Sequence, residues 1–171
     1  MQLTDILPKE GWAKLEREVH DRFHLRVHAY DTEGATFTGE TLWGNPLCPA
    51  LRKSSTAIST ICSVVNQTMR HDVANGSAAS NECDAGMLVT CTPVVVNGET
   101  LGMVGACGAF LGPEACAESF LIEKTAGIDE ETVEKMSESV PRFTPEQAQE
   151  VTDYLTARVA EIVNTYQAAK A

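Results

Sequence analysis

Three adjacent segments in the middle of the chain decide its fold: MLVTCTPVVV (Met87–Val96), the dipeptide Asn97-Gly98, and ETLGMVGACGAFL (Glu99–Leu111). The outer two are rich in apolar and β-branched residues, which favours strands. Asn-Gly is the strongest short signal for a two-residue turn between antiparallel strands. The sequence therefore predicts a long β-hairpin here.

A two-residue turn also predicts the register of this hairpin. If Val96 pairs with Glu99, then Cys91 lies opposite Val104. Because side chains alternate between the two faces of a strand, Cys91 and Cys107 are expected on opposite faces.

The chain before this hairpin carries signals for helices and for a second hairpin. Apolar residues spaced by three or four predict a helix over Glu10–His24. Two short strands around the turn Asp31–Gly34 are expected within Leu25–Phe37. The segment Cys48–His71 predicts one or two helices, and residues 75–81 carry the polar residues of a loop.

The chain after Gly112-Pro113 is expected to be helical. A short helix is predicted over Glu130–Ser137, and Thr144–Gln147 forms a capping box with proline at the first helical position. The last helix starts there, and its apolar face is formed by Val151, Leu155, Ile162, Val163 and Tyr166.

This order of elements predicts an α+β fold: one antiparallel sheet flanked by helices, with a long C-terminal helix. The 171 residues, 43% of them hydrophobic, suit a single domain. Its core is expected over about residues 10–111 and a helical C-terminal part over about 114–168.

Charge narrows the classes of partner. The chain has 13 basic and 24 acidic residues, a net charge of −11, which disfavours nucleic acids and anionic membrane surfaces. It has no apolar run near the roughly 20 residues of a membrane helix, and no secretory signal pattern. We therefore expect a cytoplasmic protein without direct nucleic-acid or membrane partners.

Six cysteines are the unusual feature of this composition. A protein of this size in a reducing compartment does not need disulfides, so the thiols are candidate ligands for a metal. Their wide spacing is a weak metal signal, and buried packing is the alternative interpretation, above all for Cys91 and Cys116. The full set is Cys48, Cys62, Cys83, Cys91, Cys107 and Cys116.

Motifs for catalysis are absent from the sequence. His20 and His24 have the spacing of a zinc protease pair, but no third ligand follows them, and a solvated helix explains them better. The glycines do not form a dinucleotide or phosphate-binding pattern, and no nucleophile elbow is present. The sequence therefore predicts a protein that is not an enzyme.

Four stretches resemble the PocR sensory domain of bacterial signalling proteins: Asn45-Pro-Leu-Cys48, Cys62, Cys83-Asp-Ala-Gly-Met87, and Thr92–Gly102. This resemblance implies a PAS- or GAF-like ligand-sensing fold that usually feeds a kinase or a transcription-activating module. It also implies that a trio of cysteines lines the sensory site. Cys48, Cys62 and Cys83 fall on that trio.

The chain departs from this family pattern at two positions. Asp84 stands where the family commonly has histidine, and Cys107 stands near the end of the last strand, where a Gly-Gln is common. Asp84 is therefore a candidate ligand-binding residue. Cys107 supplies a fourth thiol, the number that a [4Fe–4S] cluster or a structural zinc site takes.

The leading hypothesis is a sensor holding an iron–sulfur cluster at Cys48, Cys62, Cys83 and Cys107 and acting as a redox or gas sensor. Zinc or no metal are the alternatives, and Cys91 or Cys116 is a possible substitute ligand. A second hypothesis is a sensor for a small organic molecule, such as an alcohol, a diol or a corrinoid. A third is a structural protein that dimerises through its last helix. A signalling partner or a fused output domain is expected to receive the signal.

Overall fold

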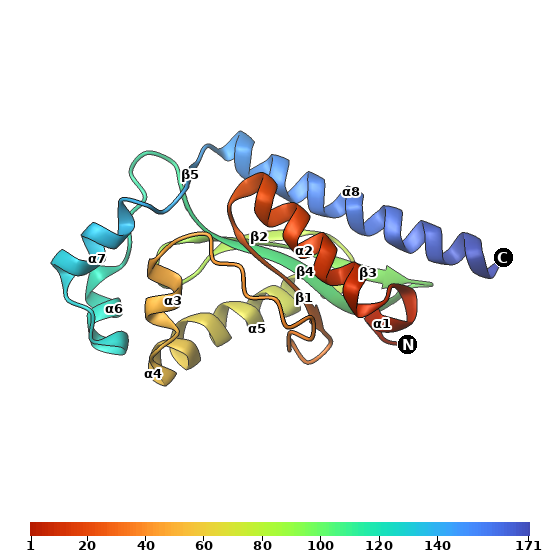
Figure 1. Cartoon of the computed structure of the whole chain (residues 1–171), viewed down its shortest axis with the longest axis horizontal. Helices are drawn as coiled ribbons and strands as arrows, with labels where there is room; N and C mark the ends of the chain where they lie inside the picture. The colour runs from red at the N-terminus through yellow and green to blue at the C-terminus, as the bar shows by residue number, and fades with distance from the viewer.

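A computed structural model describes all 171 residues and shows one sheet between two layers of helices (Figure 1). Four antiparallel strands lie in the order β1-β4-β3-β2, and a short fifth strand runs parallel to the end of β4. The strands are β1 (Arg26–Asp31), β2 (Ala79–Glu82), β3 (Leu88–Val96), β4 (Glu99–Leu111) and β5 (Arg142–Phe143).

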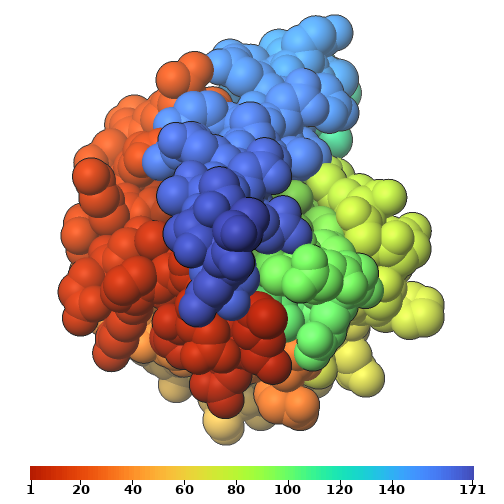
Figure 2. All heavy atoms as spheres, turned by 90° about the vertical axis from the view of Figure 1, so that its right-hand side faces the viewer, coloured from red at the N-terminus to blue at the C-terminus, as the bar shows by residue number.

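One face of the sheet is covered by α1 (Leu3–Ile6), α2 (Lys9–Phe23) and α8 (Pro145–Lys170). Seen from the end of the molecule, α8 lies between the N-terminal helices and the β3–β4 hairpin (Figure 2). The largest apolar core lies in this layer, where Trp12 and Leu155 are fully buried.

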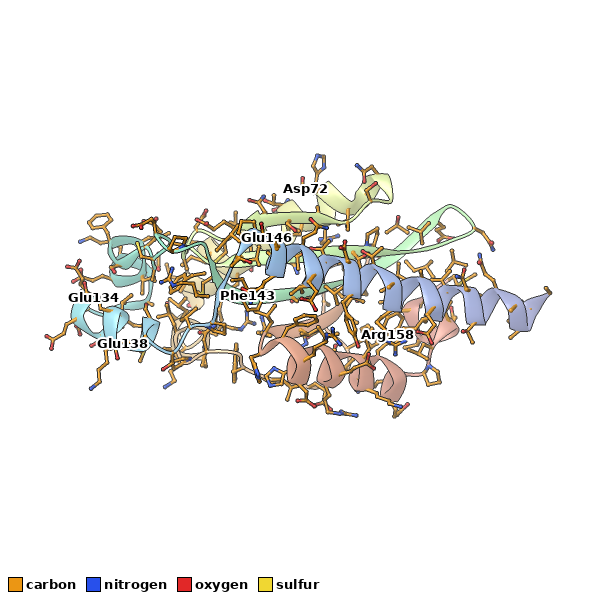
Figure 3. The ribbon with its side chains drawn as sticks, turned by 90° about the horizontal axis from the view of Figure 1, so that it is seen from above. Asp72, Glu134, Glu138, Phe143, Glu146 and Arg158 are labelled. Atoms are coloured by element: carbon orange, nitrogen blue, oxygen red, sulfur yellow. The ribbon has the colours of Figure 1, made fainter.

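An ion pair joins the two long helices of this layer. The Arg158 guanidinium of α8 donates from Nε to Glu18 Oε1 of α2 at 2.7 Å, and from a terminal nitrogen to Oε2 at 3.1 Å. Arg158 is labelled in the view from above (Figure 3). The Tyr154 hydroxyl donates to the same Glu18 carboxylate.

The opposite face is covered by shorter elements. They are α3 (Leu47–Leu51), α4 (Ser55–Ala57), the π-helical turn η1 (Ile58–Cys62), α5 (Ser63–Asp72) and the 3-10 turn η2 (Val73–Asn75). Two further helices, α6 (Ser119–Ala126) and α7 (Glu130–Ser137), pack at one end of the sheet. Their buried side chains Ile122 and Val133 join Phe110 of β4 in a second apolar cluster.

The predicted PAS/GAF-like α+β architecture is confirmed in its layers, its central hairpin and its long C-terminal helix. The short helix Glu130–Ser137 is also found as predicted. So is the capping box, in which the Thr144 hydroxyl accepts from Gln147 N and the Gln147 side chain accepts from Thr144 N.

The predicted hairpin within Leu25–Phe37 is found only in part: its first strand and its turn form, but its second strand does not. Only the bridge between Tyr30 and Thr36 follows the turn, and β1 instead pairs along its whole length with β4. The long strand β4 offers six paired residues, far more backbone hydrogen bonding than a short local hairpin. The expected loop over 75–81 is also partly wrong, because its end forms β2 along the free edge of β3.

A β-bulge changes the register of the central hairpin. The turn pairs Val96 with Glu99 as predicted, but Val94 then pairs with Gly102, which leaves Leu101 as the extra residue. A bulge of this kind shifts every later pair by one residue. Gly102 also lies against β1, where a Cβ atom would come within 2.2 Å of the Tyr30 carbonyl oxygen.

The shift overturns the predicted orientation of one cysteine. Cys91 pairs with Gly105 instead of Val104. Because Gly105 and Cys107 are two residues apart on β4, Cys91 and Cys107 share one face of the sheet.

None of the helices combines the length and hydropathy that a membrane span requires.

Candidate functional site

A cavity of about 460 Å³ lies between the sheet and the segment α3–α5. This volume lies in the range of small-ligand sites, and most of the lining side chains are apolar. Five of the six cysteines line the cavity: Cys48, Cys62, Cys83, Cys91 and Cys107. The structure thus brings together the four thiols predicted as ligands and adds Cys91.

The first thiol, Cys48, is held by a buried asparagine. The Asn45 side-chain oxygen accepts from Cys48 N at 2.8 Å, and its amide donates to the Gly108 carbonyl of β4 at 3.0 Å. The same amide lies 3.4 Å from Cys48 Sγ. Asn45 therefore ties the start of α3 to the end of β4 and fixes the thiol between them.

The second and third thiols lie on irregular backbone. Cys62 is the last residue of the π-helical turn, a widening that is common at functional sites. Cys83 follows β2 and opens a tight turn in which Gly86 N donates to Cys83 O at 2.8 Å. Gly86 has a φ of 93°, and a Cβ there would lie 2.4 Å from the Cys116 carbonyl oxygen.

The fourth thiol, Cys107, lies on β4 directly opposite Arg26 of β1. Burial raises the pKa of Cys107, while the positive charges of Arg26 and Arg52 oppose this shift. Both arginines line the same cavity. The cavity thus contains positive charge beside a thiol, in a protein whose net charge is −11.

Burial also raises the pKa of Cys48 to about 12 and the pKa of Cys83 to about 11. These two thiols are therefore neutral at pH 7 in the free protein. Cys107 and Cys62 lie close enough to add to both shifts.

Cys91 is the fifth thiol of the cavity and is buried in the sheet. Burial raises its pKa, and Cys107 is the only other group that contributes to the shift. Cys83 and Cys107 pack against the apolar cluster that contains Cys91, and Cys48 packs with Cys83 against a second cluster. Cys116 is exposed and lies outside the cavity lining.

The assignment of Asp84 to the ligand site is not supported by its position. Its side chain is exposed, and it does not line the cavity. The reason is the tight turn between Cys83 and Gly86, which directs its second residue toward solvent while Cys83 faces inward.

Sequence reasoning missed the arginines of the site. Arg26, Arg52 and Arg70 all line the cavity, against a single carboxylate, Glu33. Arg26 offered a weak signal, because it is the one basic residue besides His28 at the start of the predicted strand segment β1. Arg52 and Arg70 lie on helical segments whose sequence does not indicate which face is covered.

The cavity offers sulfur donors for a metal. No three His, Cys, Asp or Glu side chains converge on a point that would hold a single ion. The four thiols share the lining of one cavity. A [4Fe–4S] cluster takes cysteines that are spread around a cage of atoms.

The structure thus has a partly open cavity on one face of an antiparallel sheet and a long helix on the other. The family model described as the sensory domain found in PocR matches residues 5–166. The chain belongs to this family of sensory domains, a membership that supports a non-enzymatic role.

A solved structure is also similar to the chain. It is titled the crystal structure of the GAF domain/HD domain protein from Geobacter sulfurreducens, and is 14% identical in sequence. The match covers 98% of this chain and 99% of that one, with a TM-score of 0.39. No curated protein matches the chain.

Proposed function

We propose that this sensory domain holds a [4Fe–4S] cluster between Cys48, Cys62, Cys83 and Cys107 and responds to its oxidation or loss. The observation that carries the proposal is that four separate segments each deliver one thiol into a single cavity. Such a cluster would supply a redox-sensitive and gas-sensitive group.

The neutral thiols of the free protein make metal loading dependent on pH. Metal binding requires thiolates, so the neutral thiols of Cys48 and Cys83 would release protons on loading. Asn45 and Arg26 lie beside two of the four sulfurs and suit hydrogen bonding to bound thiolates. Loading is therefore expected to be favoured by rising pH.

The sheet provides a route from the cavity to α8. Cys107 faces the cavity, and its neighbour Ala106 faces the layer that contains α8. On β3 the Thr90 hydroxyl lies 2.7 Å from the Thr152 hydroxyl of α8. A change in the cavity can therefore repack α8, where a signalling partner or fused output domain would read it. Dimerisation through α8 also stays a prediction.

The test is anaerobic purification of the full chain, with visible absorption and iron and sulfide analysis. We expect a brown protein, and we expect C48S, C62S, C83S and C107S each to lose most of the iron. C116S is the matched control, because its thiol lies outside the cavity, and it should keep the iron. A colourless wild-type protein without iron after anaerobic reconstitution overturns the proposal.

A second candidate, a sensor for a small organic molecule, is favoured by the apolar lining of the cavity. Its volume of about 460 Å³ suits alcohols and diols better than a corrinoid macrocycle. Thermal unfolding with short alcohols and diols tests this alternative. A stabilisation that is unchanged in C48S would favour the organic ligand over the cluster.

A further inference from the structure

Two arginines of the cavity, Arg26 and Arg52, have no carboxylate partner. Neither forms any of the salt bridges in the structure, although the chain has 24 acidic and only 13 basic residues. The Arg26 Nε atom is buried without a hydrogen-bond partner. Both arginines are half-buried. Partial removal of an unpaired cation from water costs free energy, and a bound anion offsets that cost.

The two guanidinium groups approach the cavity from different elements. Arg26 comes from β1, and its guanidinium carbon lies 5.0 Å from the centre of the Trp43 ring, a stacking contact that restrains its orientation. Arg52 follows the last turn of α3. Both arginines line the same cavity, and Arg26 lies directly opposite Cys107 in the sheet.

We infer that Arg26 and Arg52 form a carboxylate-binding subsite for a small organic acid. A guanidinium presents planar, paired donors that match the two oxygens of a carboxylate. The rest of the lining is mainly apolar, for example Leu51 and Met103, and would accommodate a short hydrocarbon tail. This lining favours an organic acid over an inorganic anion.

This inference deepens the proposed function, since it rests on the same cavity being the sensory site. It does not require the cluster, because the arginines supply the recognition. The competing explanation is that both arginines balance the negative charge of a thiolate-bound cluster. If the arginines bind a carboxylate, neutralising one of them weakens the binding of the acid. If they balance the charge of a cluster, neutralising one of them reduces the iron content.

The experiment is isothermal titration of the full chain with acetate, propionate and butyrate at constant ionic strength. Propionamide has nearly the same shape as propionate without the charge, and sulfate has charge without a tail. The variants are R26Q, R52Q and R52K, with R17Q as the control. Arg17 is on the surface, where it pairs with Glu40. Circular dichroism and iron content are measured on the same samples.

We expect at least one monocarboxylate to bind the wild type, and we expect R17Q to bind it with the same affinity. We expect R26Q and R52Q to weaken its binding by about tenfold or more, and R52K to weaken it less than R52Q. Neither propionamide nor sulfate should bind. Arginine-dependent binding to a protein without iron would keep this inference and remove the cluster.

Three results would overturn the inference. The first is that no monocarboxylate binds the wild type, and the second is that propionamide or sulfate binds as well as propionate. The third is that R26Q and R52Q stay folded and lose iron, but keep full affinity for the acid. In that case the arginines serve the cluster.

Discussion

Cys91 and Gly105 lie directly opposite each other on β3 and β4, and the Cys91 sulfur occupies the space that a Cβ atom at Gly105 would fill. A Cβ atom at residue 105 would lie 2.8 Å from Cys91 Sγ and 3.4 Å from Cε2 of Tyr30. The glycine therefore lets a thiol and an aromatic ring meet on the floor of the cavity.

Replacing Gly105 with alanine should destabilise the protein. The added methyl group overlaps the Cys91 sulfur, and moving a strand side chain in a packed layer costs about 1–3 kcal/mol. Urea unfolding followed by circular dichroism measures the change in the free energy of unfolding.

The double variant Cys91→Ala/Gly105→Ala is the control, because it removes the clashing sulfur. It should recover part of the stability, so that the two changes are not additive. Strict additivity, or an unchanged stability in Gly105→Ala, would show that the sulfur does not occupy this space.

The same pair shows what the sequence could and could not predict. Local signals identified the hairpin, because Asn97-Gly98 and its flanking apolar segments act over a few residues. The register depended on the bulge at Leu101, which arises where β4 also meets β1 at Tyr30. Such a contact between distant segments leaves no local pattern, so the predicted face of Cys91 was wrong.

The candidate site was predictable only in part. The resemblance selected Cys48, Cys62 and Cys83, and the fold places all three around one cavity with Cys107. The role of Arg26 depends on β1 lying beside β4, a pairing that the sequence did not indicate.

Replacing Gly86 with alanine should disturb Cys83 and therefore the site. Gly86 has a φ of 93°, and a Cβ there would lie 2.4 Å from the Cys116 carbonyl oxygen. Gly76→Ala is the matched control, since its φ is 86° but no atom lies within 4 Å of its Cβ position. Backbone strain should lower the free energy of unfolding by about 1 kcal/mol in both variants. The additional clash should lower it further in Gly86→Ala, which should also lose iron or ligand binding. Equal effects in the two variants would contradict this account.

Alkylation should distinguish the exposed thiol from the cavity thiols in metal-free protein. At pH 8 a thiol with a pKa of about 12, such as Cys48, is about one part in ten thousand thiolate. Cys83, with a pKa of about 11, should also react slowly, whereas the exposed Cys116 should react first. Iodoacetamide labelling with peptide mass spectrometry measures the order, and unfolded protein labels at all six sites as the control. Labelling of Cys48 before Cys116 would contradict the burial described above.

The ion pair between Glu18 and Arg158 should make the stability depend on pH in the acid range. The hydrogen bonds from Arg158 are the largest cause that lowers the pKa of Glu18 below its ordinary 4.5. The carboxylate therefore stabilises the fold above that value, and the contribution disappears as the pH falls through the lowered pKa. For a half-buried pair we expect Glu18→Gln to lose about 1 kcal/mol at pH 7 and almost nothing near pH 2.

The comparison that tests this linkage is Glu150→Gln, which removes the exposed partner of Arg22 on the same helix layer. Exposed pairs are screened by water and salt, so this variant should stay within about 0.5 kcal/mol of the wild type at every pH. Urea unfolding between pH 2 and pH 7 should therefore show a converging pair of curves for Glu18→Gln and the wild type, and parallel curves for Glu150→Gln. If the loss in Glu18→Gln were the same at both ends of the range, its cause would be packing of the side chain between α2 and α8 rather than its charge.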